Sequence, residues 1–181
     1  MKTSPLEGKD IFLRPIISSD ATNAYVGWLN DPEVNQYLES RFSTHSTESL
    51  RKYIEEIITN PNNHFFAIVR RDSEKHIGNI KLGPIDWNHK TGDIGLMIGD
   101  KSSWGKGYAT EAIGLVTNYA FDELGLRKVT AGAYENNIGS IKAFLKQGFV
   151  EEGRKKKHFK YENSFVDHVL LAKFKEVINY E

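Results

Sequence analysis

Apolar residues recur at helical spacing in several stretches of the sequence. A stripe of leucine, tyrosine and isoleucine over residues 46–59, behind a Ser/Thr cap, predicts an amphipathic helix. The same spacing predicts the clearest helix over 107–124 and a shorter one over 136–147. Residues 18–29 form a further predicted helix with a serine cap, and Pro32 is placed to begin another helical segment.

Segments typical of strands fill the intervals between these helices. They lie at residues 10–16, 64–71, 76–85, 92–99, 127–134, 149–159 and 165–174. A short polar turn between the second and third predicts a hairpin. The order strand, two helices, three strands, helix, strand, helix, two strands predicts an α/β domain with helices against a mixed sheet. A length of 181 residues without repeat or linker fits one domain, residues 1–181.

Composition excludes several classes of function. Lysine plus arginine and aspartate plus glutamate balance at 24 each, so no basic face for nucleic acid is expected. The chain has no cysteine, which excludes disulfides, thiolate metal sites and a cysteine nucleophile. No segment resembles a signal peptide or a membrane span. We therefore expect a cytoplasmic protein with no metal and no nucleic-acid or membrane partner.

The stretch "SSWGKGYATEA", residues 102–112, places Gly105 and Gly107 in front of a predicted helix. The first N–H groups of a helix lack internal acceptors, and the helix dipole favours an anion there. The P-loop pattern is absent, and Thr110 stands where a dinucleotide fingerprint needs its third glycine. From spacing alone, a phosphate site and a plain helix start both remain open.

The predicted strand 92–99 has one unusually bare face. Ile94, Leu96 and Ile98 share one face, whereas two glycines and Met97 occupy the other. A glycine within a strand often marks a place where a ligand or another chain approaches the backbone. This strand therefore becomes a second candidate for ligand contact.

Several motifs occur together in a characteristic order. They are "LRPIISSDATNAYVGWLNDPEV", "DIGLMIG", "WGKGYATEAI", "LGLRKVTAGAYENNIGSIKAFLKQGF" and "FVDHVLLAK". In order and spacing the chain resembles the GNAT superfamily of N-acetyltransferases, and within it the RimJ/RimL-like branch. The resemblance covers nearly the whole chain. It implies a mixed sheet of about seven strands, splayed between the fourth and fifth and flanked by about four helices.

The same resemblance implies an enzyme that uses acetyl-CoA. Backbone N–H groups around the two glycines would hold the pyrophosphate of coenzyme A, and the bare strand would pair with its pantetheine arm. The implied cofactor-binding residues are Met97, Ile98, Gly99, Trp104, Gly105, Lys106, Gly107, Tyr108, Ala109, Thr110, Asn136 and Ser140. Ser102 stands where the family has glutamine or arginine, which removes one side-chain contact. Asn136 has a competing interpretation as a helix cap.

Catalysis is less visible in the sequence. Phe144 occupies the position where many relatives carry a tyrosine that protonates the leaving thiolate. Ser140, one turn earlier, is the candidate for a hydrogen bond to the sulfur. Asp93 and His168 are candidate bases, although Asp93 also fits a solvent-exposed strand entry. Because neighbouring strand residues face opposite sides, at most one of Asp167 and His168 points to the substrate.

The acceptor pocket is expected between the first two helices and the last hairpin. The nominated residues are Trp28, Asn30, Tyr37, Arg41, Phe42, His45, Phe159 and Tyr161. The stretches "NPNNHFFAIV", "IDWNHKTGDIGL" and "EEGRKKKHFKYENSFVDHVLL" are similar to enzymes that acetylate nucleotide-linked amino sugars.

We therefore expect direct transfer in a ternary complex to a primary amine of a small molecule, an amino-sugar nucleotide before others. A protein N-terminus, as in ribosomal-protein acetylases, and a polyamine remain alternatives. A non-catalytic acyl-CoA sensor is the alternative of another class, because Phe144 cannot donate a proton. Monomer and homodimer are both compatible with the sequence.

Overall fold

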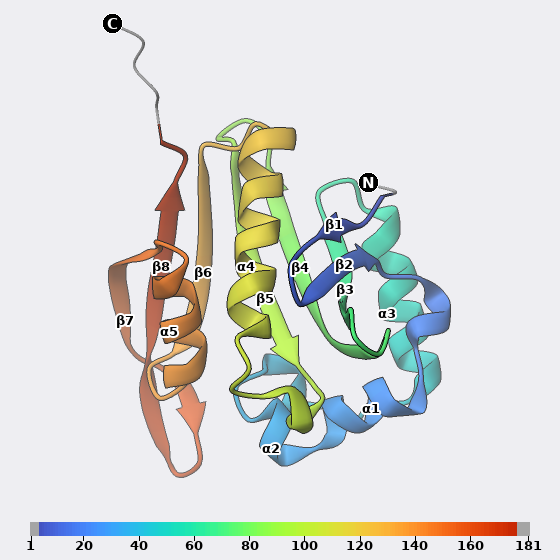
Figure 1. The fold of residues 1–181 in the computed structure, drawn as a ribbon. Helices are drawn as coiled ribbons and strands as arrows, with labels where there is room; N and C mark the ends of the chain where they lie inside the picture. Colours follow the sequence, from blue (N-terminus) through green and yellow to red (C-terminus); the bar gives the residue numbers. More distant parts are fainter. Residues whose placement is uncertain (1–3, 177–181) are drawn as a thin grey trace, which may run out of the picture.

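One mixed sheet organises the protein in a computed structural model that describes residues 4–176 (Figure 1). Eight strands lie in the order β1-β2-β3-β4-β5-β6-β8-β7. They are β1 Leu6–Glu7, β2 Ile11–Pro15, β3 His64–Arg70, β4 His76–Asp86, β5 Thr91–Ile98, β6 Lys128–Tyr134, β7 Val150–Tyr161 and β8 Ser164–Phe174. Neighbours are antiparallel except β5 and β6, which are parallel.

Helices cover both faces of this sheet. They are α1 Asn23–Asn30, α2 Pro32–Asn35, α3 Thr47–Thr59, α4 Tyr108–Asn118 and α5 Ile138–Lys146. Alternate residues of β3 divide between the two layers: Phe66 and Ile68 pack under α4, whereas Phe65 packs with α1 and α3. Figure 1 shows α4 and α5 side by side on the near face. Burial of both faces explains why β3 is apolar almost throughout.

The sheet opens between β5 and β6. Their register runs only from Thr91 opposite Lys128 to Ile94 opposite Ala131. Beyond Ile94, β5 stays paired with β4 alone, up to Ile98 opposite Gly78. The expected splay between the fourth and fifth predicted strands is thereby confirmed.

Three details differ from the expected elements. The short β1 adds an eighth strand, and α2 brings the α-helices of the described part of the chain to five. The predicted helix over 18–29 is wrong in its first turn, where Ser18–Asp20 forms a 3-10 turn and α1 begins after Thr22. The Asp20 carboxylate explains this, because it accepts from the Ile17 N–H and from Arg14.

The long predicted helix over 107–124 also changes character along its length. It is α-helical only to Asn118 and continues as a π-helical turn, Tyr119–Glu123. Gly125, with φ of 67°, follows and ends it as expected. Near the start of α4, the Glu111 carboxylate accepts from the N–H groups of Lys9 and Asp10. This residue therefore anchors the N-terminal segment, beyond any effect on the helix dipole.

Candidate active site

The glycine loop, residues 104–107, has a backbone that side chains disfavour. Gly105 has φ of 72° and Gly107 has φ of 87°. A Cβ added at either position would meet nothing within 4 Å, so conformation and not space requires glycine there. Gly107 is the N-cap of α4. The free N–H groups of the first turn of α4 therefore face outward from a left-handed turn.

Asp100 holds the segment in front of this loop. Its carboxylate accepts from Ser102 Oγ at 2.9 Å and Ser103 Oγ at 2.7 Å, and Lys75 Nζ lies 3.1 Å away. Burial alone would raise the pKa of Asp100, but these partners lower it to about 2. Ser102 is thus engaged with Asp100. Sequence reasoning missed Asp100, because an acid between a strand and a loop is not distinctive.

A cavity of about 450 Å³, the loop cavity, lies along the glycine loop. The predicted cofactor residues in its wall are Met97, Ile98, Trp104, Gly105, Gly107, Tyr108, Ala109, Thr110 and Ser140. Gly99, Lys106 and Asn136 lie outside this wall. Lys142 and Lys146 of α5 line it but were not predicted. Their i,i+4 spacing puts both cations on one helix face, which was the available signal.

The open side of β5 presents main-chain groups to the loop cavity. The Gly99 N–H donates to Ile77 O of β4 at 2.9 Å. Because hydrogen-bonding directions alternate along a strand, Leu96 and Ile98 direct their main-chain groups away from β4. Trp104 Nε1 indeed donates to Ile98 O at 2.8 Å from that side. The geometry thus favours Leu96 and Ile98 over Met97 and Gly99 as main-chain partners of a ligand.

Gly99 has a separate packing role. A Cβ at Gly99 would lie 2.1 Å from Cδ2 of Trp28. Trp28 therefore covers this end of β5 and stands outside both cavities. Asn136 leaves its Oδ1 buried without a partner in the described part of the chain, while Asn137 is the N-cap of α5.

A second cavity of about 470 Å³, the inner cavity, lies on the other side of the splay. Its wall includes Tyr25, His45, Asn79, Lys81, Tyr134 and Phe144. It meets the loop cavity at shared wall residues, which are Tyr37, Leu38, Leu96, Met97, Asn137 and Ser140. Ser140, in the first turn of α5, therefore stands where the two spaces join.

Phe144 lines the inner cavity, is 1% exposed and packs edge-on against Phe149, with 5.0 Å between the ring centroids.

Tyr134, at the end of β6, supplies a phenol in the same cavity. Its hydroxyl donates to the Glu39 carboxylate and accepts from Arg41 Nη1 at 2.9 Å. Burial and Glu39 raise the pKa of Tyr134 to about 12, so it stays protonated at neutral pH. Sequence reasoning missed Tyr134, which reads as an ordinary strand residue.

Neither candidate base lines a wall of the two cavities. The Asp93 carboxylate accepts from Thr130 Oγ1 at 2.6 Å. Desolvation by the surrounding sheet raises the pKa of Asp93 against the effect of that bond. His168 lies over Gly132, a residue of the inner-cavity wall. Burial lowers the pKa of His168, and Lys155 adds to this, so the ring is neutral at neutral pH. Asp167 is instead buried, and its carboxylate pairs with the exposed Lys156 at 2.7 Å.

The nominated acceptor residues separate into three groups. His45 lines the inner cavity, and Asn30 fixes its main chain by two hydrogen bonds of 2.8 and 3.0 Å. Arg41 reaches the site through Tyr134, as described above. Phe42 is 63% exposed and lies outside the inner-cavity wall.

Aromatic stacking ties the last hairpin to this site. Tyr37 stacks on Tyr161 at 5.6 Å, and Tyr134 stacks on Phe159 at 4.1 Å between ring centroids. Burial and the hydrogen bond with Tyr161 raise the pKa of Tyr37 to about 12. These contacts join the hairpin to Tyr37 and Tyr134 of the inner-cavity wall, but no described residue of β7 or β8 lines that cavity itself.

Comparison with known proteins decides the family. Residues 10–150 match the family model described as an acetyltransferase (GNAT) domain. The chain belongs to the GNAT acetyltransferase family. It is 34% identical to the probable N-acetyltransferase YjcK of Bacillus subtilis over 173 residues. This match covers 92% of this chain and 95% of that protein.

Solved structures of GNAT enzymes share this fold. Spermidine N-acetyltransferase from Vibrio cholerae, in complex with CoA and spermine, has a TM-score of 0.83 and 21% identity, covering 92% of this chain and 96% of that one. Ribosomal-protein-S5-alanine acetyltransferase from Vibrio fischeri has a TM-score of 0.79 and 23% identity, and the match covers 94% of this chain and 96% of that one. At these identities the likeness concerns the fold.

As a GNAT family member, this protein is an acetyl-CoA-dependent N-acetyltransferase, and the expected enzyme class is confirmed. The glycine loop, the open edge of β5 and two lysines of α5 fit an anionic donor with an amide-bearing arm. Among the described residues, no group of three His, Cys, Asp or Glu side chains suits a metal ion. Within residues 4–176, no helix has the length and apolar character needed to cross a membrane.

Proposed function

We propose that this GNAT enzyme transfers acetyl from acetyl-CoA directly to the primary amine of a small molecule bound in the inner cavity. The observation that carries the proposal is the junction of the two cavities at Ser140. A donor thioester at the end of the loop cavity and an amine in the inner cavity meet there. Proximity of this kind replaces an encounter in solution and supplies much of the rate.

The reaction needs one bond to form and one to break. The amine lone pair attacks the thioester carbon, the C–N bond forms, the C–S bond breaks and the sulfur leaves as a thiolate. A free alkyl amine is mostly protonated at neutral pH, so it must first lose a proton. We propose His168 and Asp93 as the bases that accept this proton, directly or through water. His168 is the better placed, because it lies over Gly132 of the inner-cavity wall.

The departing thiolate needs a hydrogen-bond donor. We assign this role to Ser140 at the junction. The Tyr134 phenol of the inner cavity already donates to Glu39, so it would have to turn from that carboxylate to reach the sulfur. The carbonyl oxygen lies against main-chain N–H groups at the open edge of β5, as in an oxyanion hole. Phe144 contributes an apolar wall and no proton.

An amino-sugar nucleotide is the acceptor that we place first. Tyr25, Tyr53 and Phe65 give the inner cavity an aromatic wall of the kind that packs on sugar and base faces. The lysine-rich stretch of β7 adjoins Phe159, which stacks on Tyr134, and offers cations to phosphates. A peptide N-terminus and a polyamine are the competing acceptors.

Release of free coenzyme A thiol tests the proposal. Amino-sugar nucleotides, polyamines and N-terminal peptides are compared as acceptors at saturating acetyl-CoA. We expect turnover with at least one small amine, and initial-rate patterns that require both substrates to be bound before any product leaves. A ping-pong pattern would contradict direct transfer, and turnover of peptides alone would contradict the small-molecule acceptor.

A further inference from the structure

Two side chains of β4 share the wall of the inner cavity. Asn79 and Lys81 are two residues apart and therefore point to the same face of the sheet. Their cross-strand partners on β5 are Met97 and Gly95, respectively. Both Asn79 and Lys81 line the inner cavity. Because Gly95 has no side chain and a Cβ there would meet nothing within 4 Å, β5 leaves Lys81 uncovered.

Lys81 brings a positive charge without an ion pair. Its ammonium has no salt bridge or hydrogen bond within the described part of the chain. The charge of Lys81 opposes the rise in the pKa of Asp93 that burial causes, but the Asp93 carboxylate accepts from Thr130. The acid that lines the cavity wall, Glu39, accepts from Tyr134. Both nearby carboxylates therefore have other partners.

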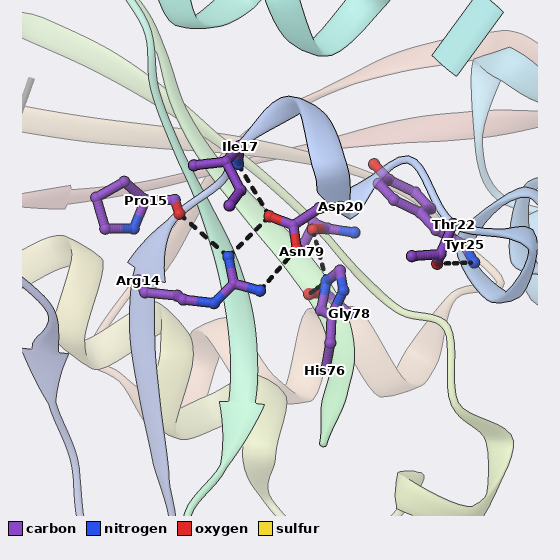
Figure 2. Close-up of polar contacts among 9 residues, drawn as sticks. All are labelled: Arg14, Pro15, Ile17, Asp20, Thr22, Tyr25, His76, Gly78 and Asn79. Atoms are coloured by element: carbon purple, nitrogen blue, oxygen red, sulfur yellow. Dashed lines mark hydrogen bonds and ion pairs between the residues drawn. The ribbon is translucent and has the colours of Figure 1, made fainter. Parts of the chain in front are cut away.

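Asn79 brings a buried donor, and its orientation is fixed by His76 (Figure 2). His76 Nε2 lies 2.9 Å from Gly78 O and 3.0 Å from Asn79 Oδ1. A backbone carbonyl only accepts, so Nε2 must carry the hydrogen and must face the amide oxygen. The NH₂ end of Asn79 is thus the unpaired end, on a residue that is 3% exposed.

The unpaired amide donor of Asn79 is unfavourable without a ligand, whereas the half-buried ammonium of Lys81 is free to bind one. Leaving a buried donor unsatisfied costs about 1–3 kcal/mol, more for a charged group. A ligand with an anionic oxygen group would satisfy both residues. A polyamine offers only further cations and would be repelled by Lys81.

We infer that Asn79 and Lys81, the donor pair, bind a carboxylate or phosphate of the acceptor and thereby select anionic amines over polyamines. This inference rests on the proposed function, since it assumes that the acceptor occupies the inner cavity. It adds the class of acceptor: an amine that carries an anionic oxygen group. An amino-sugar nucleotide belongs to this class through its phosphates.

Matched acceptor pairs test the inference. β-Alanine is compared with propylamine for the carboxylate, O-phosphoethanolamine with ethanolamine for the phosphate, and spermidine serves as the polyamine. For the wild-type enzyme we expect kcat/KM to be at least about tenfold higher for the anionic member of one pair, which also tells which anion is bound. Equal kcat/KM within both pairs, or a preference for spermidine, would overturn the inference.

Variants then assign the preference to the donor pair. Lys81→Met should lower kcat/KM for the anion-bearing amine by about 10- to 100-fold, mainly through KM, and change kcat/KM much less for the partner amine that lacks the anion. Lys81→Arg should keep the preference. Asn79→Asp, of the same shape, should reduce it by placing an acid where the donor stood. Lys52→Met, at an exposed position of α3, removes the same charge elsewhere and should change kcat/KM for neither member of a pair.

Two controls separate the possible failures. Affinity for acetyl-CoA and the thermal unfolding midpoint show whether each variant is folded. If kcat/KM of a folded Lys81→Met enzyme falls equally for both amines of a matched pair, the donor pair does not select the anion. If the wild-type enzyme acetylates small amines with and without the anionic group equally, the inference fails while the proposed function stands. If it acetylates only peptides, the proposed function fails as well.

Discussion

Two glycines decide the shape of the loop in front of α4. Their left-handed φ values of 72° and 87° arise where no neighbouring atom would exclude a side chain. The sequence pattern indicated an anion site or a helix start, and the structure shows the helix start. We propose the loop as a cofactor site as well, because Gly105 and Gly107 line a cavity that continues along β5.

Gly107→Ala should weaken binding of coenzyme A. A side chain at positive φ costs about 1–2 kcal/mol, so the variant loop should adopt another backbone conformation. Its N–H groups would then no longer match the pyrophosphate, and we expect about tenfold lower affinity for coenzyme A. Isothermal titration calorimetry with coenzyme A measures this affinity. Gly27→Ala in α1, where a Cβ also meets nothing within 4 Å but φ is not positive, is the matched control. Equal affinity in both variants would contradict the pyrophosphate site.

Ser140→Ala tests the donor at the cavity junction. We expect kcat to fall by about tenfold or more while affinity for acetyl-CoA is kept, because the hydroxyl would act on the leaving sulfur. Tyr134→Phe is the companion variant, since it removes the hydroxyl that donates to Glu39 and keeps the ring. Steady-state kinetics with one acceptor distinguishes them. Full activity of Ser140→Ala with loss in Tyr134→Phe would move the role to Tyr134.

Some of these residues could be predicted from the sequence and others could not. The glycines and Phe144 stand in motifs whose spacing along one segment carries the information. Tyr134 and Lys81 lie in different strands, and each is unremarkable in its own segment. Their role depends on strand register and on which face borders the cavity, and this is decided by tertiary packing.

At the scale of elements, β5 and the turn after it form one functional unit. The strand leaves β6 after Ile94, and the 3-10 turn Lys101–Ser103 leads into the glycine loop. Asp100 joins these parts through its bonds to Ser102 and Ser103. The splay was predicted through the family resemblance, but the carboxylate that fixes the turn was not.

Asp100→Ala should loosen this unit without touching the chemistry. Both serine hydroxyls and Lys75 would lose their common partner, so the loop would be less ordered before binding. We expect KM for acetyl-CoA to rise by about 3- to 30-fold with a small change in kcat, since one or two hydrogen bonds of about 1 kcal/mol each are lost. Asp72→Ala is the control, because it removes an exposed acid after β3. A fall in kcat at unchanged KM would contradict a purely organising role.

At the scale of the whole molecule, the sheet carries two cores with different partners. One core lies under α4 and α5, and the smaller one holds α1 and α3 over the other face. The inner cavity borders the smaller layer, and its walls come from chain segments far apart in sequence. The order of the elements predicted helices against a mixed sheet, whereas the size and lining of the cavity depend on how α1 and α3 pack on it.

The pair Arg14–Asp20 seats this layer, because it joins β2 to the turn before α1 by two bonds of 2.7 Å (Figure 2). Burial alone would raise the pKa of Asp20, but Arg14 and the Ile17 N–H hold it below its usual value. The stability contributed by Asp20 is therefore fully present above its unfolded pKa of about 3.9 and is lost as the pH falls through the lower, folded pKa.

Arg14→Met should lower the free energy of unfolding at pH 7 by about 2 kcal/mol, because it leaves a largely buried carboxylate without its main partner. The difference from wild type should shrink below about pH 4, where protonation of Asp20 removes the charge that Arg14 compensates. Urea unfolding at pH 7, 5 and 3 measures it, with Arg51→Met on the exposed face of α3 as the control for charge. A difference that is constant with pH would mean that Arg14 stabilises this layer by packing alone, and not through the Asp20 carboxylate.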